Sequence, residues 1–267
     1  MKTKLILCAM ACASLFACKK NDTTTTPTNL PTLKTVNTKG PGVSDSTKAT
    51  LTYDANGRLS QFGQTTYPGA TASTFTTTRN AYGYLTATSN TSPGFSATSV
   101  ITNDGAGHYL TNVTTYTFAK DSALFTYTGS RITQQLHYTN NGTGYMASSK
   151  DIYTYDANGN LLMDSTATSL DGGITWTGSA RSKFIYDSKI NPLQIGHDFL
   201  VINGGASSDN QVFIGPNNVT SRVDEDLTSP SISTTTFVYT YNSQNEPVSV
   251  TGTTSPSGQV VTTTYGY

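Results

Sequence analysis

The stretch Tyr153-Thr154-Tyr155-Asp156-Ala157-Asn158-Gly159-Asn160-Leu161 joins a strand pattern to a turn pattern, and it decides the fold we expect. Tyr153 and Tyr155 stand two residues apart, so both rings project from one face of an extended strand. Asp156 can accept hydrogen bonds from the backbone beyond it, and Gly159 can adopt the positive φ that closes a type I turn into a bulge. The stretch therefore predicts a β-hairpin whose second strand starts at Leu161.

The same pattern recurs along the chain, at a spacing of about 23 to 31 residues. The clearest second copy spans residues 51–59. Looser copies span residues 125–132, 184–193 and 239–248, and degenerate copies are expected at 80–85 and 103–110. A strand, a turn and a strand in each copy predict roughly a dozen antiparallel strands.

Composition supports an all-β fold for residues 48–267. Thr, Ser, Tyr, Gly and Asn dominate this region, and they favour strands and turns over helices. Open sheets rarely pass about ten strands without curling or closing. We therefore expect one antiparallel meander built from these hairpins, strongly curved or closing toward a barrel, with an elongated repeat sheet as the alternative. Charged residues make up only 12% of the chain and the net charge is zero, so nucleic acid is not an expected partner.

The N-terminus carries a basic and then apolar leader. Lys2 and Lys4 precede an apolar stretch over residues 5–16, and Ala17 stands directly before Cys18. The run Leu-Phe-Ala-Cys that ends at Cys18 resembles the lipobox of bacterial lipoproteins. The resemblance implies that a signal peptide of residues 1–17 is removed and that Cys18 is lipidated. A permanent membrane span is disfavoured because about 12 apolar residues are too few, whereas an ordinary cleaved signal peptide stays open.

The next residues predict a tether and a location. Residues 18–47 comprise the lipidated cysteine and a Thr- and Pro-rich stretch with few apolar residues, which predicts a flexible tether. Lys19 is not the aspartate that retains well-studied lipoproteins at the inner membrane, so the resemblance implies the outer membrane. The choice between the cell surface and the periplasmic face stays open. All three cysteines lie in the first 18 residues, so the domain is expected to lack disulfides.

The repeated Tyr-Asp-Ala-Asn-Gly-Asn-Leu pattern resembles the YD repeats of Rhs-type proteins. The C-terminal part is similar to a family of bacterial lipoprotein domains of unknown function, through residues 186–193, 217–220, 239–242 and 247–251. This resemblance implies the architecture and carries no catalytic residue. The many additional repeats and the C-terminal effector of toxin-enclosing shells are not found in this chain.

The chain offers few candidates for chemistry. His108, His137 and His197 are scattered and form no zinc-binding motif, so neither a metal nor a cofactor is expected. His197 and Asp198 could orient an imidazole beside a carboxylate, but an ordinary structural pair is the favoured interpretation. No nucleophile motif is present, and the chain is not expected to be an enzyme.

Trp176 is the one candidate ligand contact. It follows Gly172 and Gly173 and is expected near a hairpin tip, where an aromatic ring can stack on a sugar. We expect a non-enzymatic, membrane-anchored envelope lipoprotein that acts as an interaction or structural module, with an unidentified protein or glycan partner. The alternative is a glycan-binding accessory lipoprotein of a surface nutrient-uptake system.

Overall fold

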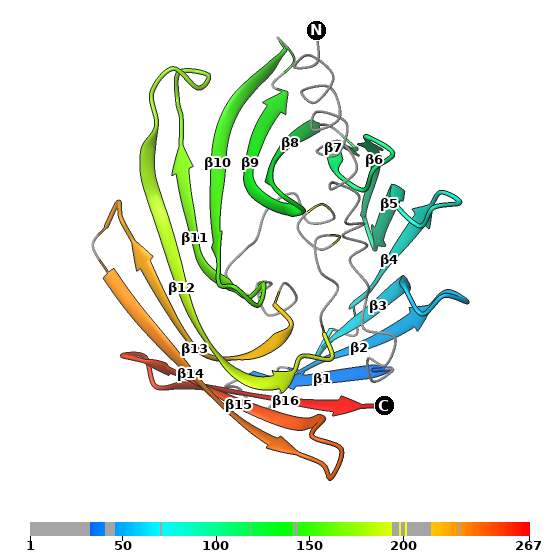
Figure 1. Ribbon diagram of the computed structural model, residues 1–267, viewed down its shortest axis with the longest axis vertical. Helices are drawn as coiled ribbons and strands as arrows, with labels where there is room; N and C mark the ends of the chain where they lie inside the picture. The colour runs from blue at the N-terminus through cyan, green and yellow to red at the C-terminus, as the bar shows by residue number, and fades with distance from the viewer. Residues whose placement is uncertain are drawn as a thin grey trace, which may run out of the picture. The chain divides into compact units, whose positions relative to one another are not determined.

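The computed structural model describes residues 33–40, 46–69, 71–117, 119–140, 142, 144–193, 198, 201, 215–229 and 231–267. These residues form an antiparallel meander of 16 strands that closes into a barrel (Figure 1). The strands are β1 (Thr35–Lys39), β2 (Ser46–Tyr53), β3 (Leu59–Tyr67), β4 (Thr71–Arg79), β5 (Leu85–Ser92), β6 (Phe95–Asn103), β7 (Tyr109–Tyr116), β8 (Lys120–Thr128), β9 (Arg131–Asn140), β10 (Tyr145–Tyr155), β11 (Leu161–Thr168), β12 (Thr177–Ile190), β13 (Asn217–Asp226), β14 (Ser231–Tyr241), β15 (Pro247–Ser255) and β16 (Gln259–Gly266).

The barrel closes between its first and last strands. Each strand pairs with its neighbours in sequence, and β1 pairs with β16 from Thr35 opposite Gly266 to Lys39 opposite Thr262. The predicted closing meander is therefore confirmed, and the elongated sheet does not form. The strand count exceeds a dozen because Thr-rich strands such as β4 lack the aromatic pattern that marks the repeats.

Strand β1 lies inside the stretch of residues 18–47 that we expected to be a tether. Its sequence, Thr-Val-Asn-Thr-Lys, offers only one apolar side chain. It is held by main-chain pairing on both edges, to β2 and to β16, and such pairing does not need an apolar pattern. The folded domain accordingly begins before residue 48.

The predicted hairpin turn forms after β10. Asp156 Oδ1 accepts a hydrogen bond from the Asn160 N–H at 2.9 Å, and the Asp156 N–H donates to the Asn160 carbonyl at 2.9 Å. Gly159 has a φ of 98°, and the strand register shifts between Thr154 and Tyr155. Four more turns repeat this geometry. They begin at Asp54, Asn80, Asp104 and Asn242.

The meander gives the barrel two different ends. The repeated turns all connect an even-numbered strand to the next odd-numbered strand, so they share one end, which we name the turn end. The connections β1–β2, β3–β4, β5–β6 and so on lie at the other end, which we name the loop end. The chain enters β1 at the turn end, because the Tyr53 hydroxyl at the end of β2 donates to the Leu33 carbonyl at 2.8 Å.

Tyrosines near the turn end of several strands bond to a neighbouring hairpin. The Tyr155 hydroxyl donates to the Ile132 carbonyl at 2.8 Å, and the Tyr186 hydroxyl donates to the Leu161 carbonyl at 2.7 Å. The Tyr127 hydroxyl accepts from the Tyr109 N–H at 2.8 Å. Burial raises the pKa of Tyr155 and Tyr186, so these hydroxyls stay protonated and able to donate.

A hydrophobic core fills the barrel near the turn end. It gathers buried side chains from β5 to β13, among them Leu85, Ile132, Tyr153 and Leu161. Val201, from the connection between β12 and β13, belongs to the same core, and its carbonyl accepts a hydrogen bond from Asn112 Nδ2 at 2.6 Å. Val201 therefore lies inside the barrel.

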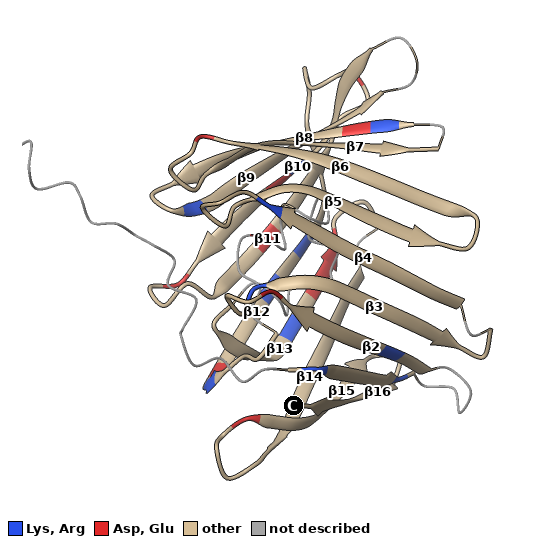
Figure 2. Ribbon diagram, turned by 90° about the vertical axis from the view of Figure 1, so that its right-hand side faces the viewer, with Lys and Arg blue, Asp and Glu red and all other residues tan. Residues whose placement is uncertain are grey.

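Side chains alternate between the inside and the outside of the wall. In β6, Ala97, Ser99 and Ile101 are buried, whereas Thr98 and Val100 between them are exposed. Because Ile101 belongs to the core inside the barrel, the exposed set faces outward. Lys, Arg, Asp and Glu residues also stand on the strands of the wall (Figure 2).

Candidate functional site

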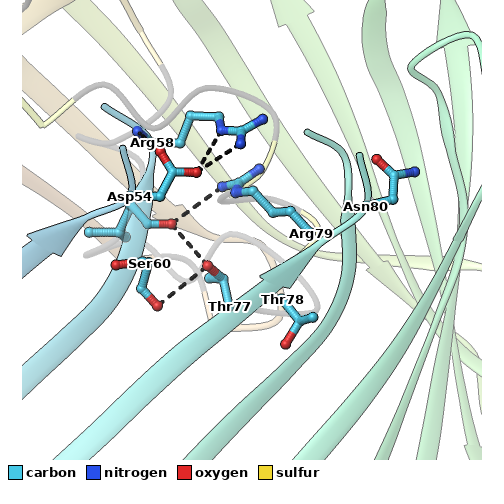
Figure 3. Close-up of a pocket in the computed structure, with 8 residues that line it drawn as sticks. Asp54, Arg58, Ser60, Thr77, Thr78, Arg79 and Asn80 are labelled. Atoms are coloured by element: carbon cyan, nitrogen blue, oxygen red, sulfur yellow. Dashed lines mark hydrogen bonds and ion pairs between the residues drawn. The ribbon is translucent and has the colours of Figure 1, made fainter. Parts of the chain in front are cut away.

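A recess of about 320 Å³ lies at the turn end, beside the β2–β3 turn and the end of β4 (Figure 3). Seven of its eight lining residues have polar side chains, and they come from two adjacent repeats. The lining residues are Asp54, Arg58, Leu59, Ser60, Thr77, Thr78, Arg79 and Asn80. The volume falls at the lower end of the range for small-molecule sites, which suits a ligand of about one ring.

The charges of the recess are balanced. Arg58 pairs with Asp54 at 2.8 Å, and Arg79 pairs with Asp198 at 2.8 Å. Burial would raise the pKa of Asp54, but the N–H groups of Arg58 and Asn56 and the Arg58 guanidinium outweigh it and lower that pKa. The recess is therefore suited to a neutral polar ligand better than to an anion.

Arg79 connects the recess to the interior of the barrel. It is 10% exposed, it donates to the Gly83 carbonyl at 2.9 Å, and its partner Asp198 accepts from the Tyr109 hydroxyl at 2.5 Å. Burial and the Asp198 charge raise the pKa of Tyr109, so the hydroxyl stays the donor. Asp198 is thus bonded to Arg79 and Tyr109, while His197 lies outside the described residues, so the interpretation of His197 and Asp198 as an ordinary structural pair stays a prediction.

The lining residues form no catalytic arrangement. They include neither histidine nor cysteine. The Ser60 hydroxyl donates to the Thr52 carbonyl at 3.0 Å, and the Thr77 hydroxyl donates to the Leu59 carbonyl at 2.9 Å. Neither hydroxyl is bonded to a base that would activate it as a nucleophile. The recess can hydrogen-bond a ligand but offers no activated group.

A second polar cluster lies on the inner wall. His137 Nε2 lies 2.8 Å from Asp151 Oδ2, and the Thr166 hydroxyl donates to Asp151 Oδ1 at 2.7 Å. The Thr166 hydroxyl donates to the carboxylate and not to the imidazole. The three groups therefore lack the arrangement of a catalytic triad, in which the hydroxyl bonds to the histidine and the histidine bonds to the carboxylate. Gln135 beside them is fully buried and accepts from the Tyr153 hydroxyl at 3.1 Å.

Acidic residues of the chain are held by protein partners. Asp224 accepts from the Ser182 hydroxyl at 2.7 Å, and Glu225 pairs with Lys183 at 2.7 Å. Asp104 lies 2.8 Å from His108 within its own turn. Across the described part of the chain, no group of three or more His, Cys, Asp or Glu side chains is placed to hold a metal ion.

Trp176 lies directly before β12, at the end of the loop that joins β11 to β12. Its ring is partly exposed, and the Lys150 ammonium lies 4.5 Å from the ring centre, within the range of a cation–π contact. The recess at the turn end is therefore a separate feature, because Trp176 is at the loop end. Sequence reasoning did not find the recess, since no sequence pattern places residues 54–60 beside residues 77–80 or pairs Arg79 with the distant Asp198.

Cys18 and the leader of residues 1–17 lie outside the described residues. A search of the described residues for a helix long and apolar enough to cross a membrane finds none.

Comparison with known proteins shows similarity of fold. No protein-family model and no curated protein matches the chain. A porin-like protein from Bacteroides uniformis superposes with a TM-score of 0.54 at 14% identity, over 89% of this chain and 97% of that one. A porin-like protein from Bacteroides vulgatus gives a TM-score of 0.48 at 13% identity, over 88% of this chain and 98% of that one. At 14% identity, the likeness to the Bacteroides uniformis protein shows the barrel fold alone.

Proposed function

We propose that this chain is a non-enzymatic envelope lipoprotein, held on the outer membrane by lipid on Cys18. In this proposal the barrel stands in water beside the bilayer and acts as an interaction or structural module. It does not span the membrane as a pore. The single observation that supports a barrel in water, outside the membrane, is the polar outer face of its wall.

The outer face differs from that of a barrel inserted in lipid. Outward positions are mainly hydroxyl residues, as at Thr98 and Thr236. Charged residues also occupy it: Glu225 pairs with Lys183 at 2.7 Å and accepts from Arg181 Nε at 2.7 Å. Membrane-spanning barrels instead carry an apolar band about 25 Å tall, and a cation at its middle costs about 2 to 4 kcal/mol.

Aliphatic side chains interrupt this polar wall, some singly and some in cross-strand pairs such as Val100 with Val113 and Leu124 with Leu136. They include Val100, Leu124, Ile152, Ile185 and Val238. Several outward neighbours of these residues are threonines, such as Thr126 and Thr154. Charged side chains stand directly opposite several outward aliphatic residues, as Lys150 does opposite Leu136 and Lys183 opposite Met163, so the described residues do not form the charge-free apolar band of an inserted barrel.

Metabolic labelling with a radioactive fatty acid tests the anchor. We expect the native chain to carry the label and to fractionate with the outer membrane, and Cys18→Ala to lose both. The polar wall predicts that the unlipidated chain is extracted by alkaline carbonate. A Cys18→Ala chain that resists extraction, as an inserted barrel does, would contradict the proposal.

Glycan binding is the second candidate function, and the charge-balanced recess favours it because a neutral sugar needs hydrogen-bonding groups without net charge. A glycan array with the purified chain tests it. Binding that falls with Trp176→Ala would assign the sugar to the loop end, whereas binding that falls with Thr78→Val would assign it to the recess. No binding to any glycan would leave the interaction or structural role alone.

A further inference from the structure

The loop between β11 and β12 exposes two aliphatic side chains. Leu170 is 101% exposed and Ile174 is 83% exposed. The loop is nevertheless well braced: Asp171 Oδ1 accepts from the Ile174 N–H at 3.1 Å, from the Thr175 N–H at 2.9 Å and from the Ser169 hydroxyl at 2.8 Å. Hydrogen bonding therefore fixes a conformation in which two large apolar groups have no packing partner.

The neighbouring hairpin extends this apolar surface. A Cβ placed on Gly172 would lie 3.4 Å from Met146 Cε, so the β9–β10 hairpin is adjacent to the loop. A Cβ on Gly173 would lie 3.4 Å from the Trp176 ring. We name as the apolar knob the set Tyr145, Met146, Leu170, Ile174 and Trp176.

Other connections at the same end also expose apolar groups. Tyr67 ends β3, Phe95 begins β6, and Leu227 follows β13, and all three are exposed. Because these connections share the loop end with the knob, their side chains are spread around one rim of the barrel. A ring of separate protruding groups fits a flat apolar surface better than it fits a groove.

We propose that the loop end rests on a lipid bilayer and that the apolar knob inserts among the lipid headgroups. This inference rests on the proposed lipid anchor. Aliphatic side chains flanked by Trp, Tyr and Lys match the interface between hydrocarbon and water, where aromatic rings lie at headgroup level. Lys150, whose ammonium lies 4.5 Å from the centre of the Trp176 ring, supplies the cation for lipid phosphates.

The chain before the barrel is long enough for this orientation. About 15 residues separate Cys18 from Leu33, and they can span roughly 50 Å when extended. The longest strand, β12, has 14 residues and spans about 46 Å. A tether that enters at the turn end can therefore reach a bilayer at the loop end. The anchor also raises the local concentration of lipid, so even a weak contact by the apolar knob is enough to keep the loop end on the bilayer.

Trp176 provides the probe, because it is the only tryptophan of the chain. The native lipidated chain is reconstituted into vesicles of phosphatidylethanolamine and phosphatidylglycerol, with or without lipids brominated on the acyl chains. We expect brominated lipids to reduce Trp176 fluorescence at least about twofold. We also expect aqueous iodide to quench Trp176 less in the vesicles than in a sample without lipid.

Two double variants make the test specific. Leu170→Ser with Ile174→Ser is expected to abolish quenching by brominated lipids. Ile185→Ser with Val238→Ser removes aliphatics that are 63% and 65% exposed on the outer wall, and it should leave quenching unchanged.

Three outcomes would overturn the inference: full iodide access with no bromolipid quenching, equal quenching in both double variants, or crosslinking of position 170 to a protein in place of lipid. A chain that leaves the vesicles altogether would instead refute the lipid anchor. Failure of the knob and failure of the anchor are thus distinguishable.

Discussion

Tyrosine precedes three of the five repeated turns, as Tyr53, Tyr155 and Tyr241, and its hydroxyl bonds to a neighbouring segment. Tyr155 is partly buried against the core, and its hydroxyl reaches the Ile132 carbonyl on the hairpin before it. Tyr53 does the same toward Leu33, and burial raises the pKa of Tyr53 to about 12. Aromatic packing and a specific hydrogen bond thus come from one side chain, which explains why tyrosine recurs at this position in place of phenylalanine.

Tyr155→Phe should lower the free energy of unfolding by about 1 kcal/mol, because it removes the bond to the Ile132 carbonyl while keeping the ring. Tyr82→Phe is the matched control, since Tyr82 is 81% exposed. Urea denaturation followed by tyrosine circular dichroism measures both. Equal effects of the two substitutions would contradict the role given to the Tyr155 hydroxyl.

Gly83→Ala and Gly57→Ala form a second matched pair. Both glycines have positive φ, 91° and 74°, so an alanine costs about 1 to 2 kcal/mol at either position. At Gly83 the new Cβ would also lie 1.7 Å from Arg58 Nη1, so Arg58 must move from its place, whereas Gly57 has open space. Denaturation should show the larger loss for Gly83→Ala. A larger loss at Gly57 would mean that Arg58 does not rest on the next turn.

At the scale of the element, the turns share one backbone geometry with different first residues. Asp54, Asp104 and Asp156 start three of them, whereas Asn80 and Asn242 start two others. The Oδ1 atom accepts the same backbone N–H groups in either case, as from Asn160 to Asp156 and from Glu246 to Asn242, both at 2.9 Å. The amide therefore replaces the carboxylate without loss of the turn, but only the carboxylate titrates.

Acid should weaken the aspartate turns selectively. Burial raises the pKa of Asp54, Asp104 and Asp156, but hydrogen bonds from their turns outweigh it and lower each pKa in the folded state. A lowered folded pKa gives stability that is full above the unfolded pKa of about 3.9 and is lost as pH falls below it.

The triple variant Asp54→Asn, Asp104→Asn and Asp156→Asn should therefore have a flatter stability profile below about pH 4 than the native chain, with a lower free energy of unfolding at pH 7, because the charged carboxylates and the ion pair of Asp54 with Arg58 are lost. Denaturant midpoints across pH 2 to 7 measure it. An unchanged acid profile would show that other carboxylates control acid unfolding.

Closure of the whole barrel depends on one seam, which we define as the pairing of β1 with β2 and with β16. Strand β1 has only five residues, yet it pairs on both edges and joins β2 to β16. The Thr38 hydroxyl also lies 3.0 Å from the Thr263 hydroxyl across the seam. Without β1, strands β2 and β16 would present unpaired edges, and such edges favour association between chains.

Thr38→Pro should open the seam, because proline removes a ladder donor from the middle of β1. We expect a loss of roughly 2 to 4 kcal/mol and the appearance of dimers in size-exclusion chromatography. Ala55→Pro is the control, since Ala55 occupies a turn position that accepts proline. A monomeric Thr38→Pro chain of native stability would show that the seam is not needed.

The hairpins were predictable from sequence because their signals are local. The roles assigned to Asp156 and Gly159 are confirmed, as is closure toward a barrel. Strand β1 was missed because main-chain pairing on both edges supplies most of what holds it, and its sequence has only one apolar side chain. The pair of Arg79 and Asp198 was missed because it joins positions 119 residues apart. The lipid on Cys18 stays a prediction, as does the ligand-binding role of Trp176.

The bonds between hairpins have a consequence for how such a barrel changes size over evolutionary time. The Tyr155 and Tyr186 hydroxyls each reach the preceding hairpin, at Ile132 and Leu161, so a hairpin and its tyrosine form a repeated unit. Duplicating the DNA of one unit would add two strands and leave β1 and β16 adjacent and antiparallel. The circumference can thus grow or shrink in steps of two strands, with the seam inherited unchanged.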